Sequence, residues 1–165
     1  MGNLHETNTF YGTSGSGALS IGGSETQHIG VDCSKNGFSI KYNVGTSSIN
    51  GADGSIITSG TAIADTWMLG YTNNKWKFTF GQPLAVIQGE MEMALATSIS
   101  NDGVHEYTNY KINIEPEHRH TVATVGYTDS ITDNVSLNMN IEYNNNYANQ
   151  DQDTWSLTTG VKYEF

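Results

Sequence analysis

Alternation of apolar and polar residues runs through most of this chain, whereas helical periodicity is nearly absent. The clearest case is the segment 154–165, in which the even positions carry small or polar side chains. The odd positions are Trp155, Leu157, Thr159, Val161, Tyr163 and Phe165. A period of two is that of a β-strand, whose successive side chains point to opposite faces. The pattern therefore predicts a strand with one apolar face at 154–165.

The same alternation predicts further strands upstream. Clear runs cover 38–44, 63–71, 75–80, 110–114, 123–127 and 135–143, and weaker ones cover 18–22 and 27–33. With 86–97 taken as a strand of its own, the segments number about ten.

Two pairs of segments can instead be merged. These pairs are 75–83 with 86–97, and 105–114 with 119–128. Merging them at kinks near Pro83 and Pro116 lowers the count to about eight. The apolar face changes after Pro83, which predicts a break or bulge there.

Turn signals separate the strands. Compact turns are expected at 34–37, 71–74, 101–103 and 128–134, and longer polar loops at 45–60 and 144–153. If the C-terminus is periplasmic, counting back places both long loops outside and the turns at 34–37 and 71–74 inside. This asymmetry is typical of bacterial outer-membrane barrels.

Composition agrees with strands that face water on one side and apolar material on the other. Only 36% of the residues are apolar, 18 are Gly and 2 are Pro, against a usual apolar share of about 45–50%. No stretch approaches the roughly 20 apolar residues of a membrane-spanning helix, so membrane residence requires a closed barrel. We therefore expect a flexible segment at 1–15 and a single β-barrel domain at 16–165. The predicted fold is an all-β, antiparallel up-and-down outer-membrane barrel of about 8–10 strands, or part of a larger one.

Charge and cysteine content exclude several classes of protein. The net charge of −10 argues against a nucleic-acid partner, which needs basic patches. Cys33 is the single cysteine, so no disulfide forms within the chain, and we expect a small side chain on a strand there. The start, MGNLHETNTFYG, has neither a basic region nor an apolar run. A signal peptide for export is therefore expected to have been removed or to lie upstream.

The C-terminal pattern resembles the insertion signal of bacterial outer-membrane proteins, which ends in an aromatic residue preceded by apolar residues at alternate positions. The residues that carry the resemblance are Trp155, Leu157, Val161, Tyr163 and Phe165. The resemblance implies that the barrel-assembly machinery binds this strand and that the protein resides in outer-membrane lipid. Trp155 stands at one end of the apolar face, and Tyr163 and Phe165 stand at the other. About ten residues tilted near 40° span roughly the 25 Å apolar band of such barrels.

A longer resemblance covers residues 61–165. Phe80-Gly-Gln-Pro-Leu-Ala-Val86 is similar to a stretch in the C-terminal translocator domains of subtilisin-like serine-protease autotransporters. The segments 101–103, 112–119 and 125–127 follow in the order seen in that family, although Glu117-His-Arg-His120 departs from its Gly-Arg-Glu ending. The resemblance implies a membrane anchor and translocator for an N-terminal passenger domain. Barrels of the family have about twelve strands, so this chain would be the C-terminal part of one. Protease activity is not carried over, because no protease domain fits here.

No catalytic, cofactor or metal site is predicted, and the chain is not expected to be an enzyme. His118 and His120 lie at i and i+2, but a third ligand is not evident. Asn149, Asp151 and Asp153 resemble the start of a calcium loop that lacks its required Gly and Glu.

Two other classes of protein remain open. One is a soluble or surface-exposed antiparallel β-sandwich with a binding or assembly role. The other is a lipid-modifying barrel enzyme, which would lose activity on replacement of His118, His120, Glu90 or Glu92. A hydrated wall is the simpler interpretation of Glu90 and Glu92.

Overall fold

The protein is all-β, with 73% of its residues in strands. The structure is a computed structural model, and it describes residues 1–11 and 13–163. The strands are β1 (Gly2–Thr7), β2 (Ile21–Lys35), β3 (Phe38–Gly51), β4 (Ile57–Thr72), β5 (Trp76–Ile99), β6 (His105–Asn113), β7 (Thr121–Thr132), β8 (Val135–Asn145) and β9 (Thr154–Tyr163). Two single-turn 3-10 helices, η1 (Gly17–Leu19) and η2 (Tyr147–Asn149), lie in connections. The predicted all-β, antiparallel up-and-down fold is confirmed.

The strands form one sheet in the order β1-β2-β3-β4-β5-β7-β8-β9, with β6 also paired to β5. Within the described residues the sheet is open, and β1 and β9 are its two edges. The expected closure into a barrel is therefore not present in this chain's structure. The described strands belong to a single sheet.

Of the two merges considered from the sequence, the one at Pro83 is confirmed. β5 runs unbroken through Pro83, and pairs with β7 over 76–81 and with β6 over 90–99. Proline lacks a backbone N–H, and Pro83 lies between these two paired stretches. The other strand is interrupted at 114–120, so β6 and β7 are separate although both pair antiparallel with β5.

Two segments expected to be irregular contain strands. Most of the predicted loop 45–60 is strand, since β3 ends at Gly51 and β4 begins at Ile57. Its polar residues alternate between buried and exposed positions, and buried Ser47 lies 2.8 Å from the hydroxyl of Thr26 on β2. Judged by hydropathy alone, a strand whose buried side is partly polar resembles a loop. Residues 2–7, within the segment expected to be flexible, form β1, which pairs with residues 23–28 of β2.

By their internal contacts the residues divide into two compact units. Unit 1 comprises 1–29, 44–64 and 86–115, and unit 2 comprises 30–43, 65–85 and 116–165.

Unit 1 has a hydrophobic core of its own. Ile21, Ile49 and Ile57 are buried, and the partly buried residues packed against them are Phe10, Met91, Met93 and Ile114. The connection between β1 and β2 contributes Phe10 to this core. Glu6 accepts a hydrogen bond from the Tyr11 backbone N–H at 2.7 Å and another from the Ser24 hydroxyl at 3.2 Å. These bonds hold the connection in place.

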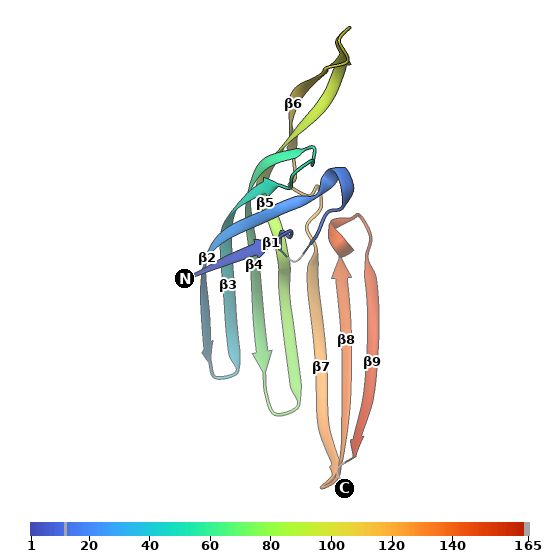
Figure 1. Cartoon of the computed structure of the whole chain (residues 1–165). Helices are drawn as coiled ribbons and strands as arrows, with labels where there is room; N and C mark the ends of the chain where they lie inside the picture. Colours follow the sequence, from blue (N-terminus) through green and yellow to red (C-terminus); the bar gives the residue numbers. More distant parts are fainter. Residues whose placement is uncertain (12, 164–165) are drawn as a thin grey trace. The chain divides into compact units, whose positions relative to one another are not determined.

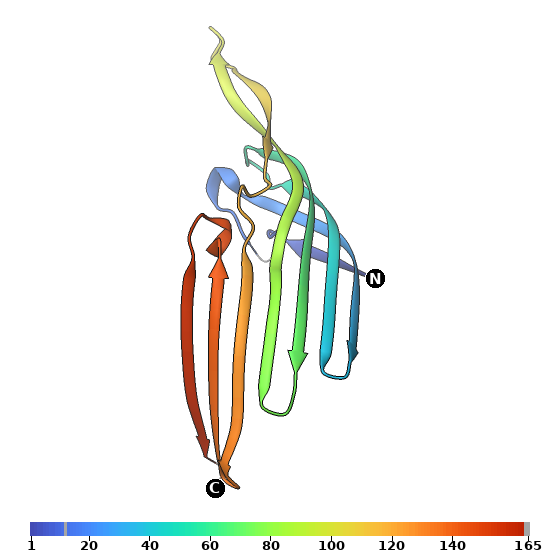
Figure 2. The ribbon, with the colours of Figure 1, turned by 180° about the vertical axis from the view of Figure 1, so that it is seen from behind.

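Unit 2 is a single layer of seven strands, β2, β3, β4, β5, β7, β8 and β9 (Figure 1). The turns β2–β3, β4–β5 and β7–β8 lie at one end of it, which we call the turn end (Figure 2). The two-residue β2–β3 turn consists of Asn36 and Gly37, both with positive φ, as the twist of such tight hairpins requires. The longer connection 146–153 lies at the other end of β8 and β9. No helix in the described part of the chain is long and apolar enough to cross a membrane.

Candidate functional site

Apolar side chains occupy different positions in the two units. In β3, the odd-numbered Ser47 and Ile49 of unit 1 are buried, whereas the even-numbered Phe38 of unit 2 is an exposed apolar residue. In β4, Ala62 of unit 1 is buried and Leu69 of unit 2 is exposed. Unit 1 thus has a buried apolar cluster, although some of its apolar residues, such as Ile99 and Val104, are exposed, and the large apolar residues of unit 2 are mostly exposed.

Cross-strand pairing gathers the exposed apolar residues of unit 2 on one face of its sheet. We call this the apolar face. Directly opposed residues share a face, and the register gives the rows Phe80/Ala123/Tyr143/Trp155, Phe78/Val125/Ile141/Leu157 and Trp76/Tyr127/Met139. Leu137/Val161 and Val135/Tyr163 continue the face toward the turn end. Period-two alternation therefore produces one continuous apolar surface across four strands.

Aromatic rings lie in two rows of the apolar face. Away from the turn end, the ring centroids of Tyr143 and Trp155 are 4.6 Å apart, and those of Trp67 and Phe80 are 5.3 Å apart. Toward the turn end, Trp76 lies 4.7 Å from Tyr127. The row between them carries Phe78 of β5 and aliphatic residues of β7, β8 and β9, and apolar pairs continue beyond Trp76 and Tyr127 toward the turn end. Amphipathic rings on an exposed apolar face are typical of residues at membrane interfaces.

Four of the five residues predicted as the insertion signal lie on this face. Trp155, Leu157, Val161 and Tyr163 are 72%, 64%, 69% and 55% exposed. β9 pairs only with β8 among the described strands, so its second edge is free. Phe165 lies outside the described residues. The structure thus brings the four described residues together on one exposed edge strand.

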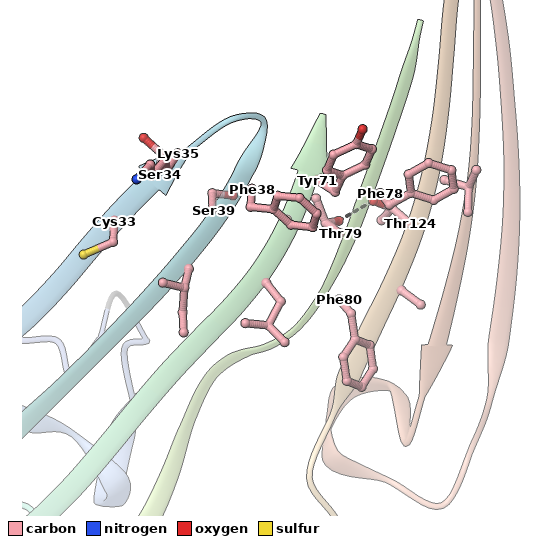
Figure 3. Close-up of a pocket in the computed structure, with 15 residues that line it drawn as sticks. Cys33, Ser34, Lys35, Phe38, Ser39, Tyr71, Phe78, Thr79, Phe80 and Thr124 are labelled. Carbon is pink, nitrogen blue, oxygen red and sulfur yellow. Dashed lines mark hydrogen bonds between the residues drawn. The ribbon is translucent and has the colours of Figure 1, made fainter. Parts of the chain in front are cut away.

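The apolar face is hollowed where β3, β4, β5 and β7 meet. This groove has a volume of about 950 Å³, and its walls include Phe38, Ile40, Leu69, Tyr71, Phe78, Phe80 and Val125. The Tyr71 ring lies between Phe38 at 4.6 Å and Phe78 at 6.4 Å (Figure 3). Cys33 lies on strand β2, as expected, where it lines the groove and is exposed.

The opposite face of unit 2 is polar, and we call it the polar face. Thr79 and Thr124 are hydrogen-bonded across β5 and β7 (Figure 3). Thr128 donates to Asn138 at 2.9 Å, and Lys41 forms an ion pair with Asp32 at 2.7 Å. These contacts pair polar side chains with one another, as expected of a wall exposed to water.

The residues considered for chemistry do not assemble into a catalytic or metal site. Glu90 and Glu92 lie on β5 in unit 1, where both approach Lys111, at 3.4 and 3.5 Å. His118 and His120 lie in the irregular segment between β6 and β7. The His120 Nε2 is bonded to the Asn144 Oδ1 at 2.8 Å. Among the described residues no group of three or more His, Cys, Asp or Glu is placed to hold a metal.

Asp153 organises the connection between β8 and β9. Its carboxylate accepts hydrogen bonds from the Tyr143 hydroxyl at 2.8 Å, the Asn145 amide at 3.0 Å and the Asn146 backbone at 3.2 Å. The hydrogen bonds from Tyr143 and then Asn146 hold the pKa of this carboxyl below its ordinary value. Asp153 therefore has a structural role in this loop.

The chain was compared with protein-family models, with curated proteins and with solved structures, and none of them matches it.

Proposed function

We propose that the protein is a strand-rich anchor of a bacterial outer membrane, with the apolar face of unit 2 against lipid. The observation that carries the proposal is the uncovered apolar face with its two rows of aromatic rings. In water, an exposed surface of this kind is costly at roughly 25 cal/mol per Å². In lipid the same surface is favourable, and the polar face is left for water.

The free edges of unit 2 support a barrel that further strands complete. β2 and β9 both run toward the turn end, and each lacks a partner on one side of unit 2 among the described strands. In lipid an unpaired strand edge costs several kcal/mol per backbone group, so the sheet must close. Because the two edge strands run in the same direction, an all-antiparallel barrel needs an odd number of added strands. One added strand would give a barrel of eight strands, and five added strands would give a barrel of twelve. Both numbers lie within the expected range for these barrels.

A narrower proposal is that the anchor acts as the translocator of an N-terminal passenger. Its support is the resemblance at Phe80–Val86 and the order of the motifs that follow. This role requires residence in the membrane, so the experiment below also tests its premise.

The native tryptophans provide a direct test. All 3 tryptophans, Trp67, Trp76 and Trp155, lie on the apolar face in its two rows of aromatic rings. We expect brominated phospholipids to quench their fluorescence after refolding into vesicles, because bromine in the acyl chains quenches only rings in contact with lipid. Bromine near the headgroups should quench more strongly than bromine at the chain ends, since tryptophan rings favour the membrane interface.

A matched control places a tryptophan on the polar face. In a background with all three tryptophans replaced by Phe, Ser156→Trp is expected to remain unquenched, because Ser156 pairs with Glu142 on that face. Native fluorescence that is unchanged by bromination would show that protein covers the apolar face. A protein that stays monomeric and unfolds cooperatively without detergent would likewise contradict the proposal.

A further inference from the structure

A hollow close to the β4–β5 turn is lined mainly by residues of the polar face of unit 2. Its volume is about 470 Å³, and its lining includes Lys77, Asn138, Asn140, Thr158, Gly126 and Gly160, together with Trp76 and Met139. The cross-strand register explains why these residues meet. Lys77, Gly126, Asn140 and Thr158 form one row across β5, β7, β8 and β9, and Asn138 faces Gly160 in the next.

Glycine creates the space. A Cβ built on Gly160 would meet no atom within 4 Å, and one on Gly126 would lie 3.6 Å from both Asn140 and Lys77. A larger residue at either position would occupy the hollow itself. The two glycines therefore keep a depression open between polar side chains.

The side chains around the hollow can supply hydrogen-bond donors. The Asn138 Oδ1 accepts from Thr128 at 2.9 Å, which leaves its amide nitrogen to donate. Lys77 is exposed, and a lysine ammonium has three donors and no acceptor. Asn140 adds a second amide, and Thr158 adds a hydroxyl.

The charges on and around the hollow favour an anion. No carboxylate side chain lines it, and Lys75 at its rim is already paired with Asp129 at 2.7 Å. The acids on the same face are Glu142, two residues beyond Asn140, which accepts a hydrogen bond from Asn144 at 2.9 Å, and Asp32, which is paired with Lys41 at 2.7 Å.

We propose that this hollow binds a small oxyanion of the phosphate or carboxylate class. Lys77 supplies the charge, and the amides of Asn138 and Asn140 with the Thr158 hydroxyl donate to the anion oxygens. Such charge-assisted hydrogen bonds are the stronger kind, and lysine serves as a point charge for phosphate. The site depends on the sheet of unit 2 and not on where the protein resides.

Titration of the folded full-length protein with inorganic phosphate tests the site. At constant ionic strength set with chloride, we expect saturable shifts of the Asn138 and Asn140 side-chain amides in ¹⁵N–¹H spectra. Lys77→Gln should weaken the apparent affinity about tenfold. Acetate tested in the same way separates a general oxyanion site from one that needs phosphate.

Two further variants complete the design. Lys41→Gln removes a lysine that is paired with Asp32, outside the hollow, and should leave the affinity unchanged. Gly160→Leu should fill the hollow and abolish the shifts while the remaining spectrum stays native. Shifts that do not saturate, or an affinity equal in Lys77→Gln and the parent, would overturn the proposal. Loss of tryptophan quenching in lipid would overturn membrane anchoring alone and leave this site standing.

Discussion

Leu157 and Thr158 are neighbours on β9 whose side chains lie on opposite faces of unit 2. Leu157 pairs with Ile141 on the apolar face, and Thr158 pairs with Asn140 on the polar face. We expect Leu157→Lys to lower the free energy of unfolding in vesicles by about 2–4 kcal/mol, the cost of a lysine facing mid-bilayer lipid. Thr158→Lys should cost little, because its side chain meets water. Urea unfolding followed by tryptophan fluorescence measures both, and equal costs would contradict the assignment of faces.

At this scale the sequence predicts one class of residue and misses another. Residues of the apolar face follow from alternation within each strand, as with Trp155, Leu157, Val161 and Tyr163. The hollow around Lys77 depends on which residues lie opposite one another on β5, β7, β8 and β9. That register cannot be derived from one strand at a time. Within β5 the only signal is Lys77 itself. The glycine, asparagine and threonine residues that complete the hollow lie on other strands.

Among the elements, the connection 146–153 depends most on a single titratable group. Asp153 accepts three hydrogen bonds that hold this connection to β8, and its folded pKa is lowered. Because the pKa of Asp153 is lower in the folded state, its carboxylate stabilises the folded loop at pH values above the unfolded pKa of about 4. That contribution is lost as pH falls through the lower, folded pKa.

We therefore expect the connection to loosen in acid, at a pH below about 4. Amide hydrogen exchange at Asn146 should accelerate there, relative to exchange at neighbouring exposed amides. Asp153→Asn should show faster exchange already at neutral pH and little further change in acid. An acid dependence that persists in Asp153→Asn would assign the effect to another group.

The strands of unit 2 are predictable from the sequence, whereas β1 and many strand ends are not. Alternation locates the strands of unit 2 because each has one mainly apolar side. In unit 1 the buried side is mixed, with Ser24, Thr26 and Ser47 beside Ile49, so the second half of β3 resembled a loop. β1 was missed for the same reason, since its six residues show no apolar side. The continuity of β5 through Pro83 depends on where its partners end, and only pairing reveals that.

At the scale of the whole molecule, the two units place their apolar side chains differently. Unit 1 packs a cluster of apolar side chains around Ile49, which is 1% exposed, although other apolar residues of this unit, such as Ile99 and Val104, are exposed. Unit 2 has no comparable cluster among its described residues, and Ile40 on its apolar face is 51% exposed. One chain with both patterns is expected if one unit meets water and the other meets lipid.

Ile49→Ala and Ile40→Ala compare the two environments with the same chemical change. We expect Ile49→Ala to lower the free energy of unfolding by about 2–5 kcal/mol, because it leaves a cavity in a packed core. Ile40→Ala should cost only about 1 kcal/mol, since lipid or detergent fills the space that the side chain vacates. Urea unfolding of the protein in phospholipid vesicles measures both. Equal, large costs would mean that protein packs over Ile40 as it does over Ile49, and the apolar face would then be an interior surface rather than one that meets lipid.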